Sequence, residues 1–258
     1  MSLLISLRTE LIKTKRSAAL WLAVLGAGMI PLIYFLFYFI KPARAAERLA
    51  TVPWEAHFLQ GWQAFSGFLL PMFVILICSL VPQIEYKNNT WKQVFASPQS
   101  LADIFFSKYL AILLMVVVLF VMFNVFMILA ACVPNLIHTS LPFFKSAIPL
   151  TRICSLSLHS FISLLAIISL QYWLSLRFRN FIVPIGIGLG LLVTTLVALV
   201  WEHVDKIPYA YPYLSYTKLV QANQPSTFFL KHEVYGILYF FVFTLAGFLD
   251  MKTRKEHG

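Results

Sequence analysis

The segment from Glu85 to Lys108 carries the residues whose types and spacing most clearly indicate a binding function. It reads EYKNNTWKQVFASPQSLADIFFSK and lies between two long apolar runs. Trp91, Val94 and Phe95 are spaced i, i+3 and i+4, so on a helix they would share one apolar face. A short helix with such a face is typical of segments that dock into a groove on another protein. We therefore predict a docking helix here.

Signatures of self-contained catalysis are absent from the sequence. The phosphate-binding pattern GxxxxGK[ST] does not occur, and neither do HExxH or GxSxG. The GxGxG run of Gly186, Gly188 and Gly190 has no preceding strand and lies in an apolar run, which favours helix packing over nucleotide binding. The three cysteines form no CxxC pair, so we predict neither a metal site nor a disulfide. These absences indicate a protein that is not an enzyme.

The composition predicts an integral membrane protein. Hydrophobic residues make up 60% of the chain and charged residues 12%, whereas soluble domains carry about 25% charge. The formal net charge of +10 comes from basic residues scattered at the ends of apolar runs. They form no stripe with stacking aromatics, so we expect no nucleic-acid partner. Basic residues at the ends of membrane spans are typical of anchors on the cytosolic side.

Six apolar runs are long enough to cross a bilayer, which requires about 20 helical residues. We predict an all-α integral membrane protein that forms a single permease-sized domain over residues 1–258. The expected spans are residues 18–40, 62–84, 109–133, 153–176, 181–201 and 234–250.

The segments outside the spans also have expected roles. Leu3, Leu4, Leu7 and Leu11 recur at helical spacing, so residues 1–16 are predicted to form an amphipathic helix at the membrane interface. Residues 85–108 form the cytosolic docking segment, and residues 205–232, rich in Pro and Tyr, are predicted to be an outer loop.

The distribution of Lys and Arg predicts the orientation. Twelve of the 20 basic residues lie on the side that holds both termini and the 85–108 segment. By the positive-inside rule we place both termini in the cytosol, with the chain in a bacterial cytoplasmic membrane as a multi-pass protein.

This layout resembles the membrane subunit of an ABC exporter of the type 2 permease family, most like the small permeases of lantibiotic or peptide self-protection exporters. The resemblance covers nearly the whole chain. Its most specific part is Glu85 at the end of the second span, then Asn89-Thr90-Trp91-Lys92, Ser97-Pro98 and Ser107-Lys108. Asn89 stands where Gly is common in the family.

The resemblance implies a non-catalytic permease that couples the motion of a separate ATPase subunit to export of a hydrophobic or amphipathic substrate, such as an antimicrobial peptide. No cofactor would bind this chain, because ATP and Mg would bind the ATPase. Further partners would be a second permease copy or paralogue and membrane lipids. Candidates for lining a substrate path are Asn124 and Gln171. The coupling helix would contact the ATPase through Glu85, Lys87, Thr90, Trp91, Lys92, Val94 and Phe95, with Gln93 at the rim.

Two alternatives stay open. An ion-driven or passive carrier is disfavoured because the span interiors contain no Asp or Glu, and Glu202, Glu233 and Asp250 fall at span ends. A non-transporting accessory protein would recruit a cytosolic partner without ATP-linked flux. A second reading of the docking helix is that it only lies on lipid headgroups, because Trp and Lys suit that position too.

Overall fold

The structure is a computed structural model that describes residues 3–15, 17–221 and 229–256. These residues form helices and no strands, and six of the helices are long and apolar enough to cross a membrane. The prediction of an all-α protein with six spans is confirmed. The α-helices are α1 Leu3–Lys15, α2 Ala18–Ile40, α3 Pro42–Arg48, α4 Pro53–Ala64, α5 Leu70–Lys87, α6 Trp91–Ala96, α7 Leu101–Ile137, α8 Leu150–Arg177, α9 Ile182–Val197, α10 Tyr211–Gln221 and α11 Lys231–Glu256.

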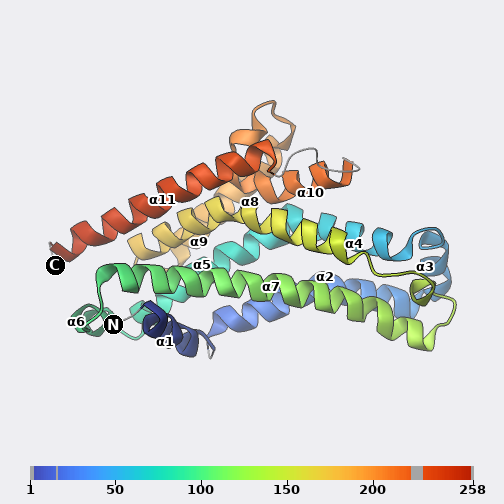
Figure 1. Cartoon of the computed structure of the whole chain (residues 1–258), viewed down its shortest axis with the longest axis horizontal. Coiled ribbons are helices and arrows are strands. Elements are labelled where there is room, and N and C mark those ends of the chain that lie inside the picture. Colours follow the sequence, from blue (N-terminus) through green and yellow to red (C-terminus); the bar gives the residue numbers. More distant parts are fainter. Residues whose placement is uncertain (1–2, 16, 222–228, 257–258) are drawn as a thin grey trace.

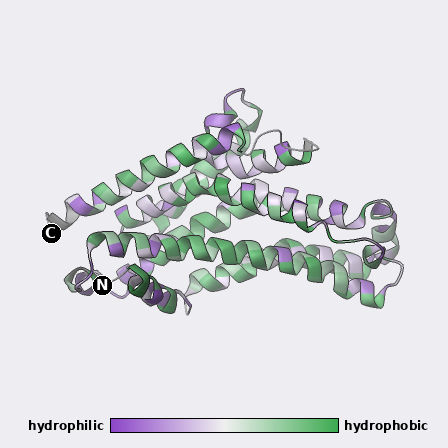
Figure 2. Ribbon diagram, viewed as in Figure 1, coloured by the Kyte–Doolittle hydropathy of each residue, from purple (hydrophilic) through white to green (hydrophobic). Residues whose placement is uncertain are grey.

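The long helices run side by side along the longest axis of the molecule (Figure 1). One end, which we call the near end, holds α1, α6 and the last turns of α11. The opposite far end holds α3 and the start of α4 (Figure 1). Apolar residues follow the long helices, and many hydrophilic residues lie towards the helix ends (Figure 2). This distribution is the one a bilayer requires of a helical bundle.

The second span is longer than the sequence predicted and contains an irregular turn. Residues Pro53–Lys87 form one candidate span, in which the π-helix η1, Phe65–Leu69, joins α4 to α5. Helix α4 begins nine residues before the predicted start of the second span, because its first turns are buried by tertiary contacts. Trp54 Nε1 donates to the carbonyl of Phe143 at 2.9 Å, and His57 Nδ1 lies 2.8 Å from the hydroxyl of Tyr38.

Residues 205–232, predicted to be an outer loop, contain short helical pieces in the described part, and the side of the membrane on which they lie stays a prediction. The chain there forms two 3-10 turns, Val204–Lys206 and Pro208–Ala210, and then helix α10. Proline at the start of a helix has no hydrogen bond to lose, so Pro208 begins a turn rather than breaking one. Helix α10 packs on α8, where the hydroxyls of Ser215 and Ser163 lie 2.5 Å apart. Residues 222–228 of the predicted loop lie outside the described residues.

The third and sixth spans are also longer than their apolar cores. Helix α7 extends over 101–137 instead of 109–133, and α11 over 231–256 instead of 234–250. Apolar runs end at the first charged residue, whereas a helix continues for as long as its charged side chains find partners or water. The connection between α5 and α7 is therefore residues 88–100, shorter than the predicted 85–108.

The predicted N-terminal helix is present as α1, but the side that packs on the protein is polar. Ser6, Glu10 and Thr14 are buried, whereas Leu4 and Leu11 are exposed. The buried residues are spaced i, i+4 and i+8, one stripe of a helix, and they face mainly α7. The exposed leucines leave an apolar side free for the membrane interface, which stays a prediction.

Candidate functional site

The connection between α5 and α7 forms a compact hairpin at the near end of the bundle (Figure 1). Helix α5 ends in a Schellman motif, in which Thr90 N donates to the carbonyl of Glu85 at 3.0 Å and Asn89 N to that of Tyr86 at 3.3 Å. Asn89 has φ of 52°, the left-handed region that favours glycine. This backbone conformation is the physical reason why Gly suits position 89, and Asn tolerates it better than most other residues do.

Helix α6 turns part of its apolar face towards its own chain. Trp91 and Val94 are half-buried and pack against the hydrophobic core. The ring of Trp91 lies 5.2 Å from that of Tyr86, and the Lys108 Nζ atom lies 5.6 Å from the Trp91 ring centroid. Such contacts hold α6 on the ends of α5 and α7.

Most of the exposed side chains that the structure describes in the hairpin are polar. Lys87, Lys92 and Gln93 are exposed, and Thr90 is half-buried. The side chain of Phe95 lies outside the part of the chain that the structure describes. We call Lys87, Lys92 and Gln93 the exposed rim. In this structure it is the rim, more than Trp91 and Val94, that is open to a partner.

Beneath the hairpin lies a buried cluster of two carboxylates and two ammonium groups, which joins α1, α5 and α7. Lys108 Nζ donates to Glu85 Oε1 at 2.5 Å and to Glu10 Oε2 at 2.8 Å. Lys13 Nζ donates to Glu10 Oε1 at 2.8 Å and to Glu85 Oε1 at 3.1 Å. Lys108 is 0% exposed and Glu85 1%. We refer to Glu10, Lys13, Glu85 and Lys108 as the charge cluster.

The formal charges of the cluster balance, and two of its members, Glu10 and Lys13, have shifted pKa values. Burial by itself would raise the pKa of the Glu10 carboxyl, but Lys108 and Lys13 outweigh it, so this pKa lies below its usual value of 4.5. Burial would likewise lower the pKa of Lys13, but Glu10 and Glu85 raise it above 10.5. Both groups are therefore charged at neutral pH.

The position of Glu85 changes its assignment. We predicted it as a contact for a partner, but its carboxylate is directed into the protein and bound by Lys108, so the surface available for docking excludes it. Sequence reasoning also did not connect Glu10 and Lys13 to this site. The sequence feature that could have indicated the pairing is the position of acidic and basic residues at the ends of apolar helices. A charge that is buried there requires a partner of opposite charge.

Asn124 and Gln171 form bonds between helices in separate places. Asn124 Nδ2 on α7 donates to the hydroxyl of Ser157 on α8 at 3.1 Å. Gln171 Nε2, fully buried, donates to the hydroxyl of Tyr209 at 2.6 Å. Ser157 and Gln171 are separated by about 21 Å along α8, so the structure does not bring the two predicted path residues together.

Two further ionisable residues are buried. His159 lies with its Nδ1 2.8 Å from Glu233 Oε1, so it is a hydrogen-bonded core histidine. Glu233 is 0% exposed, so this carboxylate faces His159 and Ser215 rather than water. In the described residues, no group of three or more His, Cys, Asp or Glu side chains is arranged to hold a metal ion.

Comparison with sequence models of protein families matches residues 6–197 to the family described as ABC-2 family transporter protein. Searches of curated proteins and of solved structures found no match. The match covers most of the chain and includes most of α1, the whole of α6 and the whole charge cluster. The six spans agree with it, and members of this family are non-catalytic membrane subunits that work with a separate ATPase. The chain therefore belongs to the ABC-2 transporter family, as a multi-pass membrane permease.

Proposed function

We propose that this chain is the membrane-spanning subunit of an ATP-driven exporter and that the hairpin between α5 and α7 docks on the ATPase. The observation that carries the proposal is the construction of this hairpin. Its rim of Lys87, Lys92 and Gln93 is exposed, whereas Trp91 on its inner side contacts Tyr86 of α5 and Lys108 of α7. A surface that receives force needs both an open side and a rigid attachment.

The charge cluster supports a route for that motion. Lys108 at the start of α7 pairs with Glu85 at the end of α5 and with Glu10 of α1. A displacement of α6 would therefore move α1, α5 and α7 together. ATP binding to the partner would then bias the bundle between two packings that open on opposite sides of the membrane.

The proposed orientation places the near end in the cytosol of a bacterial cell, with the spans in the cytoplasmic membrane. Basic residues at this end, Lys87, Lys92 and Arg177 among them, support it through the positive-inside rule. ATP and Mg would bind the ATPase, and this chain would bind no cofactor of its own.

A second permease copy or a paralogue would complete the pathway. Helix α9 supports this, because a Cβ atom added at Gly186 or at Gly190 would meet nothing within 4 Å. Small residues four positions apart allow close approach of a second membrane helix. Ile187 and Val193, near these glycines on α9, are exposed apolar residues. We therefore propose that α9 contacts the partner permease.

The proposed cargo is hydrophobic or amphipathic, with membrane-active peptides as the specific hypothesis. The spans expose long apolar faces and carry few polar groups, which suits a substrate that enters sideways from the bilayer. Neither Asn124 nor Gln171 is proposed as a specific recognition group, because the amide nitrogen of each donates within the chain and only the amide oxygens are without a partner in the described residues.

Co-purification with the ATPase tests the docking proposal. The double variant Lys92→Glu and Gln93→Glu reverses the charge of the rim without touching buried groups. We expect it to lower recovery of the ATPase at least about tenfold, since misplaced charge at an interface costs several kcal/mol. Trp91→Arg is less suitable, because Trp91 packs on its own chain.

The matched control is Lys145→Glu. Lys145 is exposed and lies on the 3-10 turn Phe143–Lys145, which connects α7 to α8 at the end of α7 that is away from α6. It should leave recovery of the ATPase unchanged. Equal recovery with the rim variant and the wild type would overturn the docking surface. Recovery of an intact wild-type permease without any ATPase would overturn the exporter assignment and favour a carrier or an accessory protein.

A further inference from the structure

A cavity of about 220 Å³ lies at the far end of the bundle, where α2, α3 and α4 meet. Helix α3 lies at the end of the bundle opposite α1 and α6, so the cavity is remote from the hairpin (Figure 1). Its lining combines the aromatic rings of Tyr34 and Phe37 with the polar groups of Arg48 and Gln60. The proposed coupling mechanism makes no use of any of these residues.

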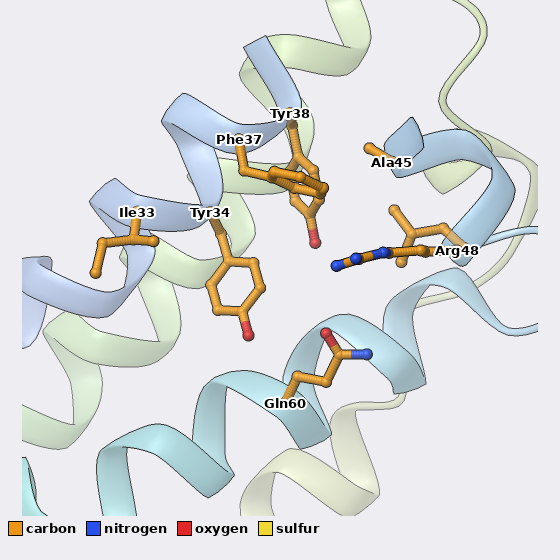
Figure 3. A pocket seen from close by; sticks show the side chains of 8 residues that line it. Ile33, Tyr34, Phe37, Tyr38, Ala45, Arg48 and Gln60 are labelled. Carbon is orange, nitrogen blue, oxygen red and sulfur yellow. The ribbon is translucent and has the colours of Figure 1, made fainter. Parts of the chain in front are cut away.

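Three hydrogen-bond donors from three helices converge on this space. Figure 3 shows the guanidinium of Arg48, the hydroxyl of Tyr34 and the amide of Gln60 directed towards one another across the cavity. Within the described part of the chain, none of the three side chains forms a hydrogen bond or an ion pair. Tyr38, also in the lining, already shares its hydroxyl with His57. Arg48 and Gln60 are exposed and Tyr34 is half-buried, so the cavity opens to the outside and its donors are accessible to a ligand.

The charge that faces the cavity is positive. Arg48 is held over the ring of Phe37, with the guanidinium carbon 5.5 Å from the ring centroid. The nearby acids do not neutralise it, because Glu47 is not part of the lining and Glu55 is paired with Arg152. A guanidinium group whose N–H donors have no protein acceptor can bind a phosphate or a carboxylate through two parallel hydrogen bonds.

One wall of the cavity is continuous with the apolar surface of the second helix, α2. Ile33 lines the cavity and is 61% exposed, and Leu32 and Leu36 beside it are exposed too. In a membrane protein such a face lies against acyl chains. A ligand held by Arg48 could extend an apolar chain along this face.

We propose that this cavity binds an anionic amphiphile. Its phosphate or carboxylate head would accept hydrogen bonds from Arg48, Tyr34 and Gln60, and its apolar chain would lie along α2 at Ile33. Such a molecule reaches the site either as a phospholipid of the surrounding leaflet or as an anionic amphiphile that enters from elsewhere. The chemistry of recognition is the same in both cases.

Native mass spectrometry of the purified permease tests the site. The protein is mixed with equal amounts of phosphatidylglycerol and phosphatidylcholine of identical acyl chains, and bound lipids are counted. We expect wild type to prefer phosphatidylglycerol and Arg48→Gln to bind it about tenfold more weakly, because a charge-assisted hydrogen-bonded pair is lost.

Arg44→Gln is the matched control. Arg44 lies on the same short helix α3, is exposed and does not line the cavity, so the variant removes the same charge from the same element. It should bind like wild type. Equal weakening by both variants would attribute the preference to overall charge and overturn the site, as would an unchanged Arg48→Gln. Tyr34→Phe and Gln60→Ala should each weaken binding by less than Arg48→Gln does.

Competition distinguishes the sources of the head group. In one outcome, dodecyl phosphate displaces phosphatidylglycerol and inorganic phosphate does not. This outcome would support a site that requires both a head group and an apolar chain and that accepts non-lipid amphiphiles. Displacement by phosphatidylglycerol alone would support a lipid site. Displacement by inorganic phosphate at equal concentration would overturn the role of the apolar wall. The assay uses the permease alone, so its outcome is independent of ATPase docking.

Discussion

At the scale of single residues, the charge cluster is the most demanding feature of this protein. Two glutamates and two lysines lie largely out of water at the junction of three helices. Each charge is tolerated only because opposite charges are close by, so loss of one member leaves another buried without compensation. The cluster therefore makes the near end sensitive to single substitutions.

Lys108→Met tests this sensitivity. The variant leaves Glu85 and Glu10 with only Lys13, which is partly exposed, and should lower stability by about 3–5 kcal/mol. Thermal unfolding in detergent measures the change. Lys92→Met removes an exposed lysine of the hairpin and should have little effect. A further change, Glu85→Gln in the Lys108→Met background, should recover part of the loss. Equal melting of Lys108→Met and Lys92→Met would contradict the ion pairing.

The same cluster predicts a dependence of stability on acid. Because the folded pKa of Glu10 is lowered, its ionised form stabilises the folded state above the usual value of 4.5, and this stabilisation is lost as pH falls through the lower, folded pKa. We expect the melting temperatures of wild type and Glu10→Gln to converge in acid. Melting curves from neutral pH downwards measure this, and a difference independent of pH would refute it.

At the scale of elements, the backbone conformation of Asn89 determines how α5 gives way to α6. Its positive φ predicts that Asn89→Gly keeps or raises stability, whereas Asn89→Val lowers it by about 1–2 kcal/mol. Thermal unfolding of the two variants beside wild type provides the comparison. Asn88→Val, at the preceding exposed position, is the control and should be tolerated better. Similar losses of stability in Asn88→Val and Asn89→Val would show that the left-handed conformation of Asn89 does not determine the effect.

The glycines of α9 provide an internal comparison of helix packing. A Cβ at Gly188 would lie 2.3 Å from Gln171 Nε2 and 2.8 Å from Ile75 Cγ2, whereas one at Gly186 would meet nothing within 4 Å. We expect Gly188→Ala to destabilise α9 against α8 and α5. Gly186→Ala should stabilise the helix by up to about 1 kcal/mol through propensity. Melting temperatures in the reverse order would contradict the packing of α9.

At the scale of the whole molecule, the exposed side of α9 bears on assembly. If a second permease packs there, Gly190→Trp should prevent its close approach without disturbing the single chain, because a Cβ atom at Gly190 would meet nothing within 4 Å. We expect chemical crosslinking to give at least about tenfold less dimer at an unchanged melting temperature. Undiminished dimer in this variant would exclude α9 as the contact.

The sequence by itself determined the class of this protein and the number of its spans. Hydropathy is a sum over neighbouring residues, so a run of about 20 apolar residues predicts a membrane helix whatever lies around it. The position of the hairpin followed from the same pattern, since the most polar connection lies between the second and third spans. Helix ends were less predictable, because polar contacts allowed α7 and α11 to continue past their apolar cores.

Only the tertiary structure decided which face of each short helix is buried. Periodicity showed that Trp91 and Val94 share a face of α6, but it could not show that this face packs on its own chain. Nor could it show that Lys108 would pair with Glu10, which lies 98 positions away. Burial of a face and pairing of charges depend on which elements meet in space, and no local property of the sequence contains that information.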